Sequence, residues 1–145
     1  MANSPLSVTA AARDHSLPPE LHDVEEAIRG SRWILEIEPD EDAGVTEPYS
    51  EAILDRAAEF LRRHALWLWK NHGVVVEAPR LEPGPSGSID IHWKAPRYEL
   101  LVNIRKDPAA PAGFYGDDYG SISIEGTLDS SASNRGLLMW LMDNA

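Results

Sequence analysis

The period of the hydrophobic pattern changes near residue 73, and this change constrains the fold more than any other feature of the chain. Between residues 50 and 72, apolar side chains recur every three to four positions, which is typical of an amphipathic helix. Ser50 is suited to cap the first turn of this helix, and Gly73 is suited to end it. From residue 74 onward apolar and polar residues alternate, as they do in half-buried strands. The sequence therefore predicts a long helix that leads into a sheet.

The alternating part of the chain predicts an antiparallel meander of four or five strands. Residues 89–94 and 98–104 alternate most regularly and predict a hairpin. A second hairpin is expected from Phe114-Tyr115 and residues 122–126, around the turn GDDYG. Shorter candidate strands are 74–76 and 80–82.

Helices are expected on both sides of this meander in the sequence. Pro18-Pro19 begins a short amphipathic helix that Gly30 ends, and residues 134–142 predict a C-terminal helix. Residues 33–37 alternate and are interpreted as a short strand or an extended linker. Grouped helices and strands predict an α+β fold with the helices on one face of an antiparallel sheet. Residues 1–17 are expected to be a flexible tail, and 18–145 a single domain.

The composition narrows the class of protein. The 145 residues are 43% hydrophobic and 26% charged, as in an ordinary globular protein. The chain contains no Cys, which excludes disulfide scaffolds, thiolate metal sites and cysteine nucleophiles. It has neither the long apolar run of a membrane helix nor the pattern of a signal peptide. We therefore expect a cytoplasmic protein without membrane contact.

The net charge of −11 is concentrated in the N-terminal third, where residues 1–48 carry 3 basic and 11 acidic side chains. Such a cluster is either a solvated loop, a docking surface for a basic protein, or a set of calcium ligands, although the glycine and spacing of an EF-hand are absent. An acidic chain disfavours nucleic acid as a partner. The carboxylates of this cluster are Glu36, Glu38, Asp40, Glu41, Asp42 and Glu47.

Trp67 and Trp69 make the end of the long helix apolar on all sides. They are expected to cover the sheet edge or fill the core, or else to form part of a partner interface.

The segment Tyr115-Gly116-Asp117-Asp118 resembles the metal-binding hairpin turn of viral RNA-directed polymerases. Adjacent carboxylates at such a turn can hold magnesium, so Asp117 and Asp118 are candidate metal ligands. A polymerase would need a further Asp upstream and several times this length. The alternative is an ordinary turn in which Gly116 and Gly120 supply positive φ.

Other motifs are weaker. Asp90 and His92 could act together as an acid–base pair, but exposed cross-strand polar pairing explains these residues better. The chain contains neither GxSxG nor a phosphate-binding glycine loop, and its basic residues form no stripe with aromatics. No catalytic residue or cofactor is therefore predicted.

Residues 49–129 resemble a loose group of uncharacterised bacterial proteins in which a helix leads into a hairpin of the form GSI-x-hydrophobic-x-W. These proteins look like small accessory components of mobile or defence loci, which implies the same layout of helix and meander but no catalytic residue. The residues that carry the resemblance are Gly87, Ser88, Ile89, Trp93, Asn103, Tyr115, Gly116, Asp117, Asp118, Gly126 and Asp129.

The leading functional hypothesis is a non-enzymatic accessory component, such as an antitoxin or immunity protein, that binds a basic protein through its acidic surface. A second hypothesis is a metal-dependent enzyme centred on Asp117 and Asp118, assisted by His92 or Glu125. A third is a structural subunit of a larger assembly that uses the Trp67 and Trp69 region or the C-terminal helix. The sequence leaves the oligomeric state open.

Overall fold

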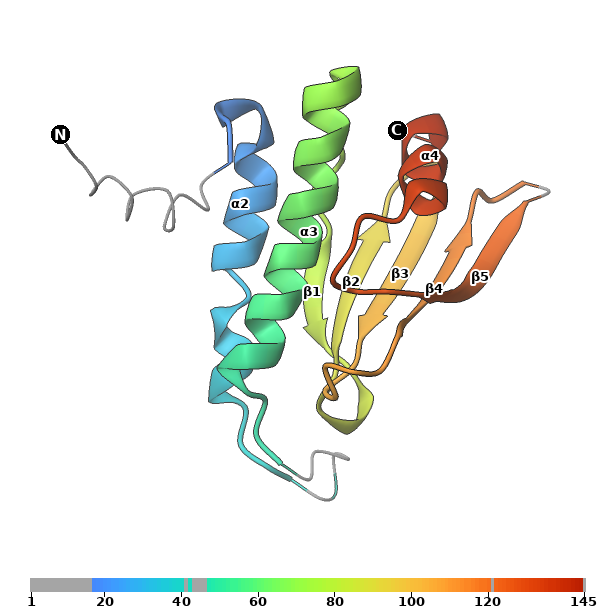
Figure 1. The fold of residues 1–145 in the computed structure, drawn as a ribbon. Helices are drawn as coiled ribbons and strands as arrows, with labels where there is room; N and C mark the ends of the chain where they lie inside the picture. Colours follow the sequence, from blue (N-terminus) through green and yellow to red (C-terminus); the bar gives the residue numbers. More distant parts are fainter. Residues whose placement is uncertain (1–16, 41, 43–46, 121, 145) are drawn as a thin grey trace, which may run out of the picture.

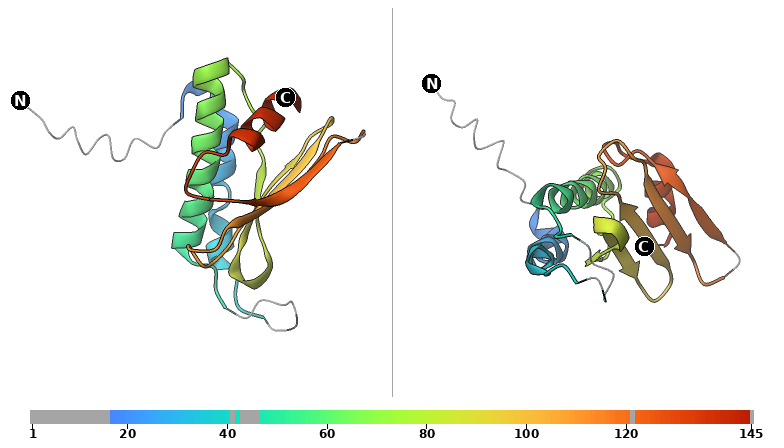
Figure 2. Two further views of the ribbon diagram at one scale, coloured as in Figure 1. Left: turned by 45° about the vertical axis from the view of Figure 1, so that its right-hand side comes forward. Right: turned by 90° about the horizontal axis from the view of Figure 1, so that it is seen from below.

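A five-stranded antiparallel sheet carries the helices on one of its faces (Figures 1 and 2). The computed structural model describes residues 17–40, 42, 47–120 and 122–144. Each strand pairs with the next along the chain, so the order across the sheet is β1-β2-β3-β4-β5. This arrangement confirms the predicted α+β fold and antiparallel meander. The strands are β1 (Arg80–Pro83), β2 (Ile89–Lys94), β3 (Glu99–Ile104), β4 (Ala112–Asp117) and β5 (Ser123–Leu128).

The helices α2 (His22–Arg29), α3 (Glu51–His72) and α4 (Arg135–Asn144) cover the sheet from the same side (Figure 2, left). α3 packs on β2 and β3, α2 lies beside α3 and reaches β1, and α4 lies next to α3. The described residues also form the short 3-10 helices η1 (Pro19–Leu21), η2 (Arg32–Glu36) and η4 (Pro85–Gly87).

The core lies between α3 and the sheet. Alternate residues of β2 and β3 point toward the helices and are buried, whereas their neighbours are partly exposed on the other face. This alternation is the physical reason for the period of two in the sequence. Buried core side chains from helix and sheet include Phe60, Leu61, Leu68, Ile89, Ile91, Trp93, Leu100, Val102 and Ile104.

Both ends of α3 are formed as the sequence predicts. The Ser50 Oγ accepts a hydrogen bond from the Ile53 amide at 3.2 Å, which caps the first turn. Gly73 ends the helix in the left-handed region at φ 65°, where a side chain would be strained.

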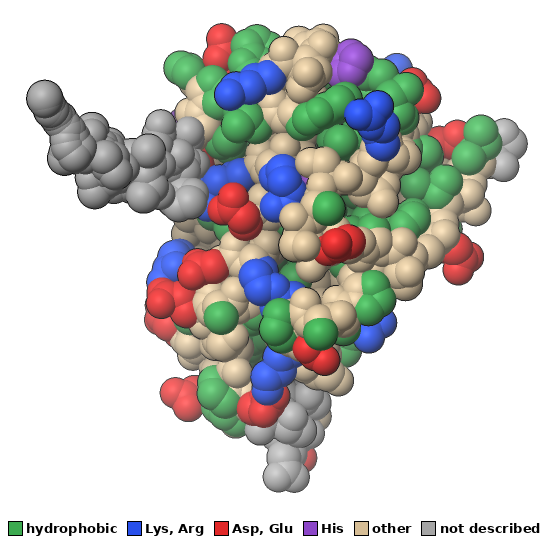
Figure 3. Space-filling model, in the orientation of Figure 1, with side chains coloured by type: hydrophobic (Ala, Val, Ile, Leu, Met, Phe, Trp, Pro, Cys, Tyr) green, Lys and Arg blue, Asp and Glu red, His purple; other side chains and the backbone are tan. Residues whose placement is uncertain are grey.

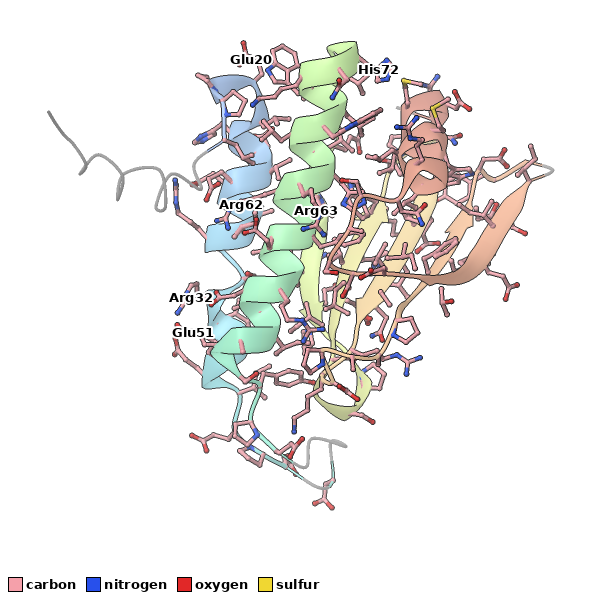
Figure 4. The ribbon with its side chains drawn as sticks, in the orientation of Figure 1. Glu20, Arg32, Glu51, Arg62, Arg63 and His72 are labelled. Carbon is pink, nitrogen blue, oxygen red and sulfur yellow. The ribbon has the colours of Figure 1, made fainter. Side chains whose placement is uncertain are left out.

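Three arginines on the outer side of α3 tie it to its neighbours. Arg62 forms an ion pair with the Glu25 of α2, with an Nη2–Oε2 distance of 3.2 Å. Arg63 Nη2 donates to the Ser130 carbonyl at 2.6 Å, ahead of α4. Arg56 donates to two carbonyls just after β3. Figure 4 shows Arg62 directed toward α2 and Arg63 toward the other side of α3. The polar side of α3 therefore binds α2, the end of β3 and the segment before α4 through arginine side chains.

Residues 33–37, predicted to be a strand or an extended linker, form the 3-10 helix η2 instead. The Ile34 amide donates to the Ser31 carbonyl and the Ile37 amide to the Ile34 carbonyl. These local bonds satisfy backbone groups that have no strand to pair with. Of the apolar side chains in this segment, Ile34 is fully buried, whereas Trp33 is 52% exposed.

Residues 74–76, predicted to be a strand, join no ladder of the sheet. The segment connects α3 to β1, with Val76 buried and Val75 exposed. The Glu77 carbonyl that follows it accepts a hydrogen bond from the Trp93 indole at 2.8 Å.

The predicted flexible tail, residues 1–17, lies outside the described residues except for Leu17. No helix in the part of the chain that the structure describes is long and apolar enough to cross a membrane.

His64 fastens α3 to the start of α4. Its side chain is 1% exposed, its Nδ1 lies 2.8 Å from the Phe60 carbonyl, and its Nε2 lies 3.2 Å from the Asn134 amide. Nε2 can accept from that amide only when it carries no proton. Burial is the main cause that lowers the pKa of His64 to about 4, and the nearby Arg63 charge adds to it.

This geometry predicts acid destabilisation. Because the folded-state pKa lies below the ordinary 6.5, the contribution of neutral His64 is complete above pH 6.5 and is lost as the pH falls toward about 4. Chemical denaturation across this range should show a loss of up to about 3 kcal/mol attributable to this residue. His64→Leu should lower the stability at pH 7 and flatten the profile between pH 6.5 and 4. An unchanged profile in the variant would contradict this role for His64.

Candidate functional site

The acidic segment before α3 is open to solvent. Glu36, Glu38, Asp40 and Asp42 are exposed, and none of them has an ion-pair partner among the residues that the structure describes. Glu47 differs, because its carboxylate pairs with the Lys106 ammonium group. Glu41 lies outside the described residues. Four predicted partner-binding residues thus present unpaired negative charge.

The two tryptophans lie at the other end of α3 from this segment (Figure 1). A helix of 22 residues is about 30 Å long at 1.5 Å per residue. Trp67 and Trp69 are half-buried against the core, and the Trp67 ring lies 5.1 Å from that of His72. The structure therefore does not bring the acidic segment and the tryptophans into one surface.

The acidic charge is local rather than general on the helical side of the molecule. Figure 3 shows Lys and Arg side chains interspersed with Asp and Glu over α2 and α3. Part of this mixture consists of exposed ion pairs, such as Arg32 with Glu51 at 2.6 Å and Arg29 with Glu26 at 2.5 Å (Arg32 and Glu51 are labelled in Figure 4). These ion pairs reduce the net charge on the surface of the helices.

The candidate metal ligands Asp117 and Asp118 shape the β4–β5 turn. Asp117 Oδ1 accepts from the Tyr119 amide at 2.8 Å. Asp118 Oδ1 accepts from the amides of Gly120 at 2.9 Å and Ile122 at 3.2 Å. Within the described part of the chain no three acidic or histidine side chains group as a metal site would require.

Positive φ in this turn belongs to Tyr119, at 62°, and not to Gly116 or Gly120 as the sequence suggested. Gly116 serves packing instead. A Cβ on it would lie 3.0 Å from the Ile124 side chain and 3.1 Å from the Trp140 ring. The absence of a side chain therefore lets α4 approach the sheet closely.

His92 bridges three strands on the face of the sheet opposite the helices. Its Nε2 lies 2.6 Å from Glu99 Oε2 on β3, and its Nδ1 lies 3.3 Å from Glu82 Oε1 on β1. A carboxylate only accepts, so both contacts are hydrogen bonds at once when both ring nitrogens carry protons. Cross-strand pairing is thus confirmed for His92, with different partners from the Asp90 of the acid–base hypothesis.

Asp90 belongs to a second polar cluster, next to the β1–β2 connection. Asn103 Nδ2 donates to Asp90 Oδ1 at 2.7 Å and to Ser88 Oγ at 2.8 Å, and Ser88 donates to the Pro85 carbonyl at 2.6 Å. A Cβ on Gly84 would lie 2.5 Å from Ser88 Oγ. These residues hold the connection in place, and nothing in their arrangement leaves a reactive group free.

The far end of the same open face is acidic and aromatic. Glu99, Asp117 and Glu125 lie on neighbouring strands, and the register places Tyr115 opposite Glu125. The Asp117 carboxylate raises the pKa of Tyr115, with smaller contributions from Glu125 and Glu99. Tyr115 is 44% exposed and Tyr119 is 51% exposed. We call this set of five residues the acidic–tyrosine patch.

The sequence could not reveal this patch, because its members are brought together by strand register. Glu99 lies opposite Asp117 and Tyr115 lies opposite Glu125, and a shift of one residue in the strand register would separate these pairs. The alternation of residues 89–94 and 98–104 showed only that polar side chains share a face.

No protein family, curated protein or solved structure matches the chain.

The turn role of Asp118 predicts a loss of stability in Asp118→Ala. Two backbone amides lose their acceptor, which should reduce the free energy of unfolding by about 1–2 kcal/mol. Asp143→Ala is the matched control, because it removes an exposed carboxylate of α4. Urea denaturation measures both, and equal stabilities would contradict the role of Asp118.

The metal hypothesis is tested by calorimetric titration with Mg²⁺, Mn²⁺ and Ca²⁺. Because no third acidic or histidine side chain groups with Asp117 and Asp118 among the described residues, we expect no binding heat at millimolar metal. A saturable heat that Asp117→Asn abolishes would contradict this expectation and favour the enzyme hypothesis.

Proposed function

We propose that the protein is a non-enzymatic accessory component that acts in the cytoplasm by binding a basic protein, as an antitoxin or immunity protein does. The single observation that carries the proposal is the run of exposed carboxylates at Glu36, Glu38, Asp40 and Asp42, which have no ion-pair partner among the residues that the structure describes. Elsewhere several carboxylates are neutralised by a neighbouring cation, as in the Arg62–Glu25 pair.

The excess of negative charge would act mainly on association. A net charge of −11 attracts a basic protein over a distance of about one Debye length, roughly 8 Å at physiological salt. Because these carboxylates have no ion-pair partner among the described residues, none of the described ion pairs has to break when they bind. Such a surface contributes to rate and selectivity of association more than to raw affinity.

His64, His92, Asp117 and Asp118 could in principle perform acid–base or metal chemistry, but each has structural partners, which also supports a binding function. His64 is buried between α3 and the start of α4, and His92 lies between two glutamates. Asp117 and Asp118 hold a turn.

Neutralising the acidic segment should weaken partner binding and leave the fold intact. The test variant carries Glu36→Gln, Glu38→Gln, Asp40→Asn and Asp42→Asn. The control removes the same number of charges elsewhere, with Glu20→Gln, Asp23→Asn, Glu77→Gln and Asp143→Asn. Each tagged protein is expressed in the native host and purified at moderate salt, and the co-purified partner is quantified.

The wild type and the control should retain the partner, and the test variant should lose most of it. Recovery of only free protein from all three, or equal recovery with the test variant, would contradict the proposed function. Circular dichroism and thermal unfolding verify that the test variant is folded.

A further inference from the structure

The two edges of the sheet differ in how they are protected. β1 has four residues, contains Pro83 and follows Pro79. Proline protects an edge strand from pairing with another chain, because it has no backbone N–H to donate. The end of α2 and η2 also approach it across a cavity of about 370 Å³. β5 has six residues, contains no proline, and exposes Ser123, Glu125, Gly126 and Thr127 to solvent.

The outer backbone of β5 has no partner within the described residues. Its recorded backbone pairing is with β4, and no hydrogen bond links Ser123–Leu128 to another segment. In Figure 1 β5 forms the outer margin of the sheet, and the chain that follows it crosses the face of the sheet toward α3. Every second residue of an antiparallel edge strand directs its amide and carbonyl outward. β5 therefore presents a row of free donors and acceptors.

The charged side chains of β4, β5 and the turn between them are all acidic. Residues 112–128 contain no Lys or Arg. Glu125 lies on β5 itself, and Asp117 and Glu99 follow on the next two strands of the same face. Tyr115 and Tyr119 add exposed aromatic rings, on whose faces cations bind favourably.

The residues of β5 that face the helices are apolar by contrast. Ile124 is half-buried against the core and Leu128 is buried. A strand added beside β5 would place alternate side chains next to these two groups and the others next to Glu125. The fitting strand therefore alternates apolar and basic residues.

We propose that β5 receives an extended segment of a basic protein as a sixth strand, with Lys or Arg side chains over the acidic–tyrosine patch. This inference rests on the proposed function and names a surface for it. Backbone hydrogen bonds would supply affinity, and the carboxylates would select basic side chains. A second copy of this chain is a poorer occupant, because its β5 would bring another Glu125 and no cation.

The probe is an octapeptide of alternating Lys and Val, titrated into the full-length ¹⁵N-labelled protein. Saturable chemical-shift changes should centre on residues 123–128 and the facing residues of β4. An analogue that is N-methylated at every residue keeps the charges but cannot donate backbone hydrogen bonds, and it should bind at least about tenfold more weakly. This comparison needs no variant of the protein.

Charge-reversal variants test whether the peptide binds the acidic–tyrosine patch or the acidic segment before α3. Glu125→Lys should weaken the peptide by about tenfold, whereas Glu38→Lys, an equally exposed carboxylate of the acidic segment, should leave the affinity nearly unchanged. A spectrum that keeps its dispersion verifies the fold of each variant.

The β5 proposal would be overturned by the absence of a saturable shift of β5 at millimolar peptide, by equal binding of the N-methylated analogue, or by shifts confined to residues 36–42. Concentration-dependent β5 shifts without peptide would overturn it in favour of a second copy. The proposed function is judged separately, by whether the four-carboxylate variant loses the native partner.

Discussion

The packing of α3 against β2 and β3 is the contact on which the rest of the structure depends. Phe60, Leu61 and Leu68 on the helix and Ile91 and Leu100 on the sheet are fully buried. Each such side chain contributes about 1.5–3 kcal/mol by its removal from water. Because α2 and α4 lie on the same side as α3, this contact covers one face of the sheet and leaves the other to polar residues. The open face follows from this one-sided cover, whereas the free β5 edge follows from the strand order.

Polar contacts then fix the connectors around that core. Trp93 holds the chain between α3 and β1 through the Glu77 carbonyl, and Arg63 holds the segment before α4 through the Ser130 carbonyl. His64 accepts from the Asn134 amide, while Asn134 Oδ1 accepts from the Leu137 amide and caps α4. These polar side chains therefore hold the loops and the start of α4 in place. Unpaired charge is found on the segment before α3 and on the sheet margin.

Local patterns predicted much of this fold, and relations between distant segments did not follow from them. The capping residues of α3, the hairpin of residues 89–104 and the hairpin around GDDYG depend on spacing alone and were confirmed. Residues 33–37 alternate and residues 74–76 are three valines, and both patterns are typical of strands, but neither segment has a neighbouring strand to pair with among the described residues. The partners of His92 depend on register, and the burial of His64 depends on where α4 docks. The acidic segment was visible as composition, whereas the free β5 edge required the strand order.

Native-state hydrogen exchange of the free protein tests most directly the claim that one face and one edge of the sheet are left open. The account predicts that the amides of β2 and β3 exchange slowest, through global unfolding. Alternate amides of β5, directed away from β4, should exchange in the folded state orders of magnitude faster. Slow exchange at every β5 amide, equal to that of β3, would show that the edge is covered and would contradict the account.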